Sequence, residues 1–241
     1  AVDHVDLTIL PILEMFKMND PMLFVLHGNN TIKNRGCEAI ALSTMGLLRE
    51  GFPACRIVHT PYLVRADRAD EPSALEGAPV QPWCFNTRYS FHWWAHQASK
   101  IIGRSHEPLH RLVAGATAVL ECGGDTFSLD YATPSMRFRT MDISLRAGCP
   151  LVLWGASVGP FSQNTEFEKY AARRLKEFAL ICARESATVE YLNSIGVTEN
   201  VRRVADPAFL LEPEGVDLER EDLALLRQPC LGLNFSALMT M

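Results

Sequence analysis

The sequence predicts an α/β protein in which helices cover both faces of a doubly wound, mainly parallel β-sheet. The main observation is that three apolar runs each stop at a small polar loop marked by glycine. These junctions are Leu23–Leu26 with His27-Gly28-Asn29-Asn30, Ala118–Leu120 with Cys122-Gly123-Gly124-Asp125, and Leu151–Trp154 with Gly155-Ala156-Ser157. Continuous apolar runs are typical of parallel strands buried on both faces. Because ligands of such sheets bind beyond the carboxyl ends of the strands, we expect function to reside on these three loops.

The second observation is that strand-like and helix-like segments alternate along the chain. After the first strand, Gly36–Glu50 carries apolar residues at helical spacing and is closed by Gly51, and a strand at Arg56–His59 follows. We then expect helices at 89–102, after Pro108, at 134–146, 166–177 and 186–194, alternating with strands at 117–121, 151–154, 178–182 and 201–204. This alternation predicts βα units and therefore a parallel sheet.

Local signals support these elements in turn. The 89–102 segment is rich in aromatic residues, and Pro108 suits the start of a short helix. The 166–177 segment is amphipathic, with Phe167 and Leu175 on one face and Lys169 on the other. Gly196 marks the end of the 186–194 helix.

The chain divides into four stretches by composition. Residues 1–21 mix charges and prolines without a sustained period and are expected to be a leader outside the fold, and residues 22–211 form the main α/β domain. Residues 212–229 are acidic and polar around Pro213 and Gly215, which indicates a linker. Residues 230–241 hold a new apolar strand, Leu231–Phe235, which we expect to open a second domain truncated at this point.

Composition and charge exclude several classes of function. The 241 residues are 48% hydrophobic and 21% charged, which suffices for a globular core. A net charge of -5 gives no general attraction to phosphate backbones, so nucleic acid is not an expected partner. No apolar run approaches the roughly 20 residues of a membrane span, and Leu7–Leu13 lacks the positive flank of a signal peptide. We therefore expect a cytoplasmic protein without a transmembrane segment.

Metal chemistry is not expected either. Seven scattered cysteines include no Cys-x-x-Cys pair, so most are expected to be small core residues. Cys122 stands in a glycine loop where its thiol could meet a ligand, but a small residue at a tight turn is the favoured interpretation. His106-Glu107-Pro108-Leu109-His110 spells a zinc-protease pattern, but Pro108 prevents the continuous helix that this pattern requires. His92 and His96 stand among aromatic residues without a third ligand, which favours a packed helix.

Two further motifs fail on their context. Gly155-Ala156-Ser157-Val158-Gly159 has the spelling of a nucleophile elbow, but Pro160 delays the helix that should follow the serine, and no histidine lies downstream. Neither glycine-rich nucleotide motif occurs after a strand. The first loop nevertheless carries Asn29, Asn30, Asn34 and Arg35 directly before a helix. These donors could hold an anion at the helix N-terminus, and the alternative is a solvated loop in which Asn34 caps the helix.

Arg184 and Asp206 also follow predicted strands. Arg184 stands between a strand and a helix, so its guanidinium is expected at the same edge as the glycine loops, where it would suit a carboxylate or a phosphate. The alternative is an ion pair with Glu185 or Asp206. Asp206, before Pro207, could accept from a hydroxyl group or form a turn.

Five motifs in this order resemble the polysaccharide pyruvyl transferase family. They are Asn34-Arg35-Gly36-Cys37-Glu38-Ala39-Ile40, Gly123-Gly124-Asp125, Gly155-Ala156-Ser157-Val158-Gly159-Pro160, Ala183-Arg184-Glu185-Ser186 and Asp206-Pro207-Ala208-Phe209. The resemblance covers residues 22–235 and implies a Rossmann-like sheet similar to the N-terminal half of a GT-B-like two-domain enzyme. It also implies a transferase that moves a pyruvyl group from phosphoenolpyruvate to sugar hydroxyls as a ketal.

The resemblance further implies roles for individual residues. Arg184 would contact the anionic donor, and Asp125 would contact hydroxyl groups, with Gly123 and Gly124 shaping the edge. Glu38 would support the first loop or serve as a base, and Asn29, Asn30, Asn34, Arg35, Ser157 and Asp206 would complete the binding residues. No metal or cofactor is implied, and phosphoenolpyruvate acts as donor substrate. The general-acid histidine and a further donor-binding arginine would lie beyond this sequence.

The expected partners are phosphoenolpyruvate and a saccharide or lipid-linked glycan, with a homo-oligomer as one option. Two other functions stay open. One is a nucleotide-sugar-dependent glycosyltransferase of the same architecture, and the other is a non-catalytic sugar-binding half-protein that pairs with another chain. In every case we expect this stretch of sequence to be inactive alone, because half of a cleft does not exclude water.

Overall fold

The computed structural model describes residues 22–28, 35–60, 108–129 and 135–211, together with Pro229 and Leu231. The chain divides into two compact units, residues 1–211 and residues 212–241, and the described fold belongs to the first. The predicted helix at 89–102, the linker at 212–229 and the strand at 231–235 fall outside the described residues, apart from Pro229 and Leu231.

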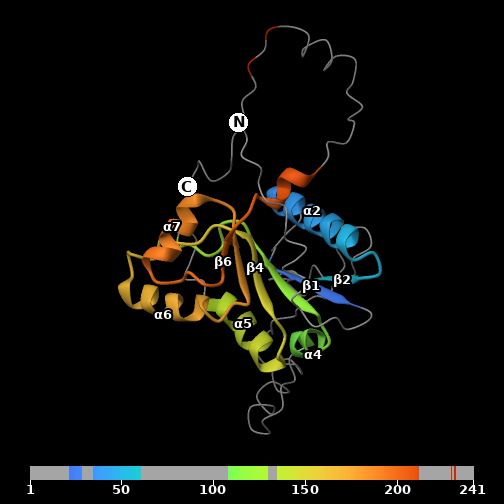
Figure 1. Ribbon diagram of the computed structural model, residues 1–241, viewed down its shortest axis with the longest axis horizontal. Helices are drawn as coiled ribbons and strands as arrows, with labels where there is room; N and C mark the ends of the chain where they lie inside the picture. Colours follow the sequence, from blue (N-terminus) through green and yellow to red (C-terminus); the bar gives the residue numbers. More distant parts are fainter. Residues whose placement is uncertain are drawn as a thin grey trace, which may run out of the picture. The chain divides into compact units, whose positions relative to one another are not determined.

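The centre of the first unit is a six-stranded parallel sheet in the order β2-β1-β3-β4-β5-β6. Its strands are β1 (Leu23–His27), β2 (Arg56–Thr60), β3 (Ala118–Cys122), β4 (Leu151–Ala156), β5 (Leu180–Ala183) and β6 (Val201–Arg203). The helices are α2 (Arg35–Gly51), α4 (Pro108–Ala114), α5 (Ser135–Ala147), α6 (Thr165–Leu175), α7 (Ser186–Ser194) and the 3-10 helix η2 (Pro207–Leu210). The predicted α/β class is confirmed, with a Rossmann-like alternation of strands and helices (Figure 1).

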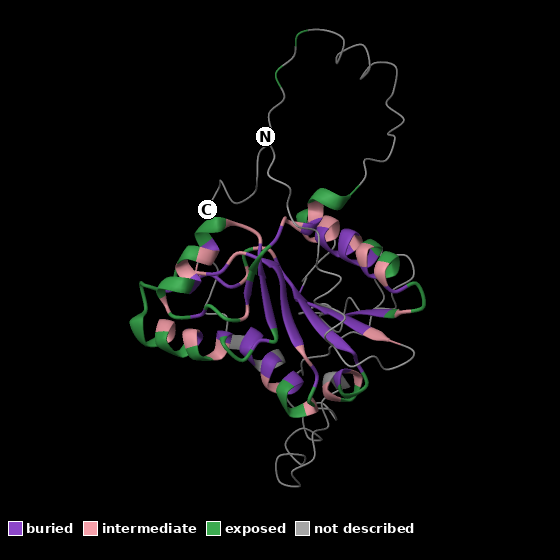
Figure 2. Cartoon of the chain, viewed as in Figure 1, coloured by how far each residue is buried: buried purple, intermediate pink, exposed green. Residues whose placement is uncertain are grey.

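The helices cover both faces of the sheet because its strands are apolar on both faces. On one face, the buried side of α2, including Met45 and Leu48, packs against Phe24, Leu120 and Trp154. A second core on the other face joins the sheet to α4, α5, α6 and α7. The central strands are buried throughout, whereas the outer sides of the helices are exposed (Figure 2). This three-layer arrangement leaves the edges of the sheet as the places where loops can form a site.

The strand order creates a switch point between β1 and β3. The connection after β1 passes through α2 to β2 on one side, while the chain after β3 proceeds through α5 to β4 on the other. Loops that leave neighbouring strands in opposite directions open a crevice at the carboxyl edge, where ligands of such sheets bind. The loops after β1 and β3 therefore stand at the favoured position for a site.

The boundaries of the described elements differ from the predicted ranges by at most two residues, and two of these differences have a clear physical reason. β4 continues to Ala156 through a register irregularity between Leu153 and Ala156, so Gly155, with φ +58°, lies inside the strand instead of ending it. β5 begins at Leu180, because the N–H of Phe178 still donates to Leu175 O in the turn that ends α6. The short helix after Pro108 is confirmed as α4, and η2 is an element that the sequence reading did not predict.

Trp154 gives a test of the contact between the sheet and α2. Its indole Nε1 donates to Thr44 Oγ1 at 2.9 Å, and both residues are buried. Thr44→Val should lower the free energy of unfolding by about 1–3 kcal/mol, because it leaves a buried indole N–H without an acceptor. Urea denaturation measures this loss. Thr44→Ser keeps the hydroxyl and should retain more of the stability, whereas equal losses for the two variants would contradict the role of this bond.

Candidate active site

Arg184 is the centre of a polar cluster at the carboxyl edge of the sheet. It directly follows β5, and its side chain is 23% exposed. Its Nε donates to Ser157 Oγ at 2.9 Å, and its Nη1 donates to Asp206 Oδ2 at 2.8 Å. Nη2 makes no hydrogen bond with the residues that the structure describes. Two neighbours thus hold the guanidinium in place, and such a planar fork of donors is suited to a carboxylate or a phosphate.

The glycine loop after β3 lies directly against this arginine. A Cβ placed on Gly124 would lie 3.2 Å from Arg184 Nη1, which is a tight contact for any larger residue. The N–H of Ser157 donates to Gly124 O at 2.7 Å, so a backbone hydrogen bond connects the loops after β3 and β4. Phe127 and Val158 add an isolated parallel bridge between the same two loops. Gly124, Ser157 and Arg184, all selected from the sequence, therefore meet at one edge.

Asp206 has a double role in this arrangement. Its Oδ1 accepts from the N–H of Ala208 at 2.9 Å and caps η2, while Oδ2 holds Arg184. The ion pair weighed as the alternative for Arg184 is therefore present, with Glu185 Oε2 farther away at 3.9 Å from Nε. Because the partner of Arg184 is a fixed carboxylate at a turn, the pair orients the guanidinium toward the edge.

The first loop is described only in part. Asn29, Asn30 and Asn34 lie outside the described residues, and α2 begins at Arg35. Arg35 is 90% exposed at its side chain and donates from Nη1 to Glu38 Oε2 at 2.7 Å, across one helical turn. The carboxylate of Glu38 is thus engaged with its own helix, which favours a supporting role for this residue over that of a base.

The start of α2 lies near the glycine loop. Burial raises the pKa of the half-buried Cys37 thiol, and the charge of Asp125 raises it further while that of Arg137 lowers it. These influences place the first turn of α2 within electrostatic range of Asp125, which is exposed beyond β3, and of Arg137 on α5. The described residues that follow β3, β4 and β5 therefore lie at one edge of the sheet, and the first turn of α2 lies within electrostatic range of them.

Comparison with known proteins decides the family. The family model described as polysaccharide pyruvyl transferase matches residues 34–234. The chain belongs to the polysaccharide pyruvyl transferase family. The comparison with curated proteins gave no match.

A solved structure shares the fold of this pyruvyl transferase family member. It is the crystal structure of Anabaena HepE in complex with UDP and glucose, with a TM-score of 0.51 and 13% sequence identity. The match covers 85% of this chain and 49% of the HepE chain, so the present sequence spans about half the length of that protein. At this identity the likeness concerns the fold alone, and it supports the Rossmann-like, GT-B-like architecture.

A buried ionic cluster at the switch point, formed by Arg137, Glu121 and His27, was not predicted from the sequence. Arg137, on α5, donates from Nη1 to Glu121 Oε1 at 2.5 Å, and both side chains are almost fully buried. Glu121 Oε2 lies 3.9 Å from His27 Nε2 and has no hydrogen-bond partner among the described residues. The signal in the sequence was a glutamate at the end of the apolar strand run Ala118–Leu120, where ionised groups are rare unless paired.

The first two strands each carry a buried histidine in this region, His27 in β1 and His59 in β2. His27 Nδ1 contacts the carbonyl and hydroxyl oxygens of Thr60 at 3.0 and 2.9 Å. Burial lowers the pKa of His27, against an opposing effect of Glu121. Burial also lowers the pKa of His59, to about 4, with a smaller contribution from His27. Both rings are therefore neutral in the folded protein at pH 7, and they act there as polar packing groups.

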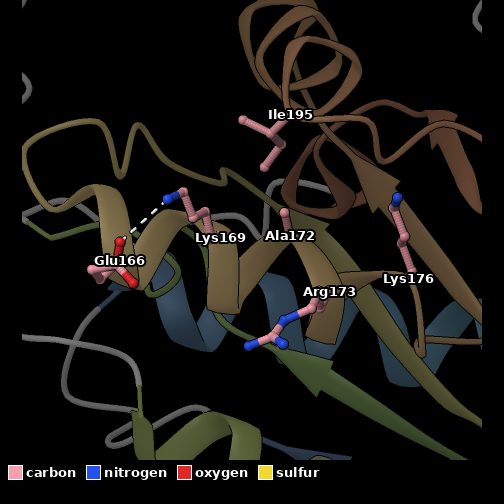
Figure 3. Close-up of a pocket in the computed structure, with 6 residues that line it drawn as sticks. All are labelled: Glu166, Lys169, Ala172, Arg173, Lys176 and Ile195. Carbon is pink, nitrogen blue, oxygen red and sulfur yellow. Dashed lines mark hydrogen bonds and ion pairs between the residues drawn. The ribbon is translucent and has the colours of Figure 1, made fainter.

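A groove of about 540 Å³ along α6 lies away from this edge. It is lined by Glu166, Lys169, Ala172, Arg173, Lys176 and Ile195 (Figure 3). Lys169 is paired with Glu166 at 3.2 Å. None of the site residues selected from the sequence lines this groove, so the candidate site is assigned to the carboxyl edge instead.

The described residues supply two further observations on ligands and membranes. They contain no group of three or more His, Cys, Asp or Glu side chains arranged to hold a metal ion. Within the same part of the chain, no helix has the length and apolar character of a membrane span.

The lowered pKa of His59 predicts acid sensitivity. The unfolded chain binds a proton at this histidine below about pH 6.5, whereas the folded ring stays neutral down to about pH 4. Stability should therefore fall as pH is lowered through this interval, by up to about 3 kcal/mol from this residue. Chemical denaturation at a series of pH values measures the slope.

The matched comparison is His59→Leu, which removes the titrating group. This variant should show a shallower loss between pH 6.5 and 4, while the two proteins should follow the same slope between pH 7 and 8. An unchanged slope below pH 6.5 would show that His59 is not the residue responsible.

Proposed function

We propose that this chain supplies the N-terminal half of the active site of a transferase that moves a pyruvyl group from phosphoenolpyruvate to sugar hydroxyls. Membership of the polysaccharide pyruvyl transferase family supports the reaction class. The observation that carries the assignment to this edge is the held guanidinium of Arg184, with Nη2 unused by the described residues, beside Gly124.

The donor requires such an environment because it carries a carboxylate and a phosphate on one small carbon skeleton. Arg184 can offer a planar, charged donor to one of these groups. Because Gly124 has no side chain, its backbone can lie close to the guanidinium and still leave space for an anion. The second anionic group calls for a further cation, and Arg35 at the exposed start of α2 is one candidate in this chain.

The proposed reaction converts the methylene carbon of phosphoenolpyruvate into a methyl group. A proton is added to that carbon while a sugar oxygen attacks the adjacent one, and a second sugar hydroxyl then displaces phosphate to close the ketal. The two hydroxyl protons balance the reaction, since one equals the proton gained by carbon and the other leaves with phosphate. Asp125, exposed beside Gly124, would bind acceptor hydroxyls, and Ser157 and Asp206 would hold Arg184.

A second candidate is transfer of a sugar from a nucleotide sugar. The similar HepE structure holds UDP and glucose, and a polar carboxyl edge of the same fold could serve either donor. The two functions separate in one assay. Incubating the complete protein with glycan acceptors and either phosphoenolpyruvate or UDP-glucose should release inorganic phosphate only from the former. Release of UDP with the latter, and no phosphate from the former, would favour glycosyl transfer.

Replacement of Arg184 tests the proposed donor contact. Arg184→Ala in the complete protein should lower kcat/KM for phosphoenolpyruvate by roughly 10- to 100-fold, because a hydrogen bond to a charged group is lost. Arg184→Lys keeps the charge but not the planar fork, so its kcat/KM should lie between those of the parent protein and Arg184→Ala. Steady-state kinetics with varied donor and saturating acceptor measures both effects.

Arg173→Ala is the matched control, because Arg173 lies in the groove along α6. It should leave the donor kinetics unchanged. Thermal unfolding of each variant separates a binding effect from a folding effect. Parental donor kinetics in Arg184→Ala would remove this residue from the site.

A further inference from the structure

We propose that Arg137 and Glu121 are a positioning pair for the donor site, acting through the Gly123–Gly124 loop on Arg184. The inference rests on the proposed function and adds residues that the sequence reading did not select. Neither side chain reaches the surface, since Arg137 is 6% and Glu121 1% exposed. Any effect on a ligand must therefore pass through the backbone that they hold.

Arg137 contacts both loops that form the switch point. Its Nη1 and Nη2 each lie 3.4 Å from Gly28 O, just after β1, and its Nη1 donates to Glu121 Oε1 at the end of β3. Its guanidinium carbon also lies 6.0 Å from the centre of the Phe127 ring. One side chain from α5 thus joins the ends of two neighbouring strands at the place where their loops diverge.

The glycine loop lies between two guanidinium groups. A Cβ on Gly123 would stand 3.3 Å from Arg137 Nη1, whereas a Cβ on Gly124 would stand 3.2 Å from Arg184 Nη1. Consecutive glycines are therefore packed against two different arginines, the first buried and the second accessible. A displacement of Arg137 would shift the backbone that Arg184 touches.

Backbone contacts extend this connection to the β4 loop. The N–H of Gly159 donates to Phe127 O at 2.8 Å, and the N–H of Ser157 donates to Gly124 O at 2.7 Å. Ser157 in turn accepts from Arg184 Nε. The connection from Arg137 to Arg184 therefore runs through the close approach of Arg137 to Gly123, then through the hydrogen bonds of Ser157 with Gly124 O and with Arg184 Nε.

Gly28 shows how closely this region is packed. Its φ is +106°, and a Cβ there would lie 2.7 Å from both Cys122 O and Glu121 Oε1. Gly28 thus lies against the ionic pair without space for a side chain. The hydrogen bonds from Arg137 to Gly28 O also fix the orientation of this carbonyl.

The energetics favour geometry over stability as the role of the pair. Removing two charges from water is costly, and a buried ion pair is often replaced by apolar residues without loss of stability. The pair instead restricts the geometry of the strand ends. A guanidinium group that donates to Gly28 O and Glu121 Oε1 at the same time permits few arrangements of the two loops.

The test compares the double variant Arg137→Met/Glu121→Leu with its single variants in the complete protein. Each single variant removes one partner of the buried ion pair and should lower the melting temperature, whereas the double variant should recover most of that loss. Despite this recovery, the double variant should have a kcat/KM for phosphoenolpyruvate lowered by roughly 10- to 100-fold, because the loops lose their alignment.

The matched control is Arg174→Met/Asp142→Leu, which removes an arginine–carboxylate pair between α6 and α5. It should leave donor kinetics unchanged. Parental kinetics in the Arg137→Met/Glu121→Leu double variant would overturn the positioning role. Should the double variant fail to fold, Arg137→Lys decides in its place, since a lysine keeps the charge and loses the fork: donor kinetics lowered at an unchanged melting temperature support the role, and parental kinetics overturn it.

Hydrogen exchange separates this inference from the proposed reaction. The double variant should exchange the amides of residues 123–127 and Ser157 faster than the parent, with unchanged exchange in β5. This result would stand even if the parent protein transferred no pyruvyl group, an outcome that would reject the proposed function alone. Unchanged exchange in the glycine loop would reject the positioning pair whatever the substrate.

Discussion

The site depends on one constraint of the parallel sheet, the divergence of the chain after β1 and β3. The chain leaves β1 toward β2 and leaves β3 toward β4, in opposite directions along the strand order. Ligands of such sheets bind at the carboxyl edge where neighbouring strands diverge in this way. At this edge, backbone and a few side chains from the helices approach one another closely. Gly28, Gly123 and Gly124 supply the close backbone, and Arg137 supplies the contact that joins the two strand ends.

Two arginine–carboxylate pairs on either side of the glycine loop differ in what they can do. The Arg137–Glu121 pair is shielded from solvent, so its charges interact strongly and fix the positions of the loops. The Arg184–Asp206 pair is partly exposed, since the two side chains are 23% and 22% exposed. Asp206 and Ser157 hold the orientation of Arg184, and its Nη2 makes no hydrogen bond with the described residues. In the proposed site, the first pair orders the loops and the second pair binds the donor.

Much of the fold could be predicted from the sequence because apolar runs and glycine punctuation are local signals. The strands at Leu23, Leu151 and Val201 and the helix at 186–194 follow from such patterns. Ser157 and Arg184 could also be assigned to one edge, since the carboxyl ends of parallel strands share it. Their hydrogen bond, and the capping of η2 by Asp206, depend on side-chain directions that spacing does not contain.

The Arg137–Glu121–His27 cluster could not be predicted, since its members are distant in sequence and each is ordinary in its own context. Only the three-dimensional register of β1 and β3, which pairs His27 with Glu121, brings them together. The most direct test of the account is a crystal structure of the complete protein with phosphoenolpyruvate. A carboxylate or phosphate oxygen should lie within hydrogen-bond distance of Arg184 Nη2. A donor bound elsewhere, with Arg184 held only by Ser157 and Asp206, would contradict it.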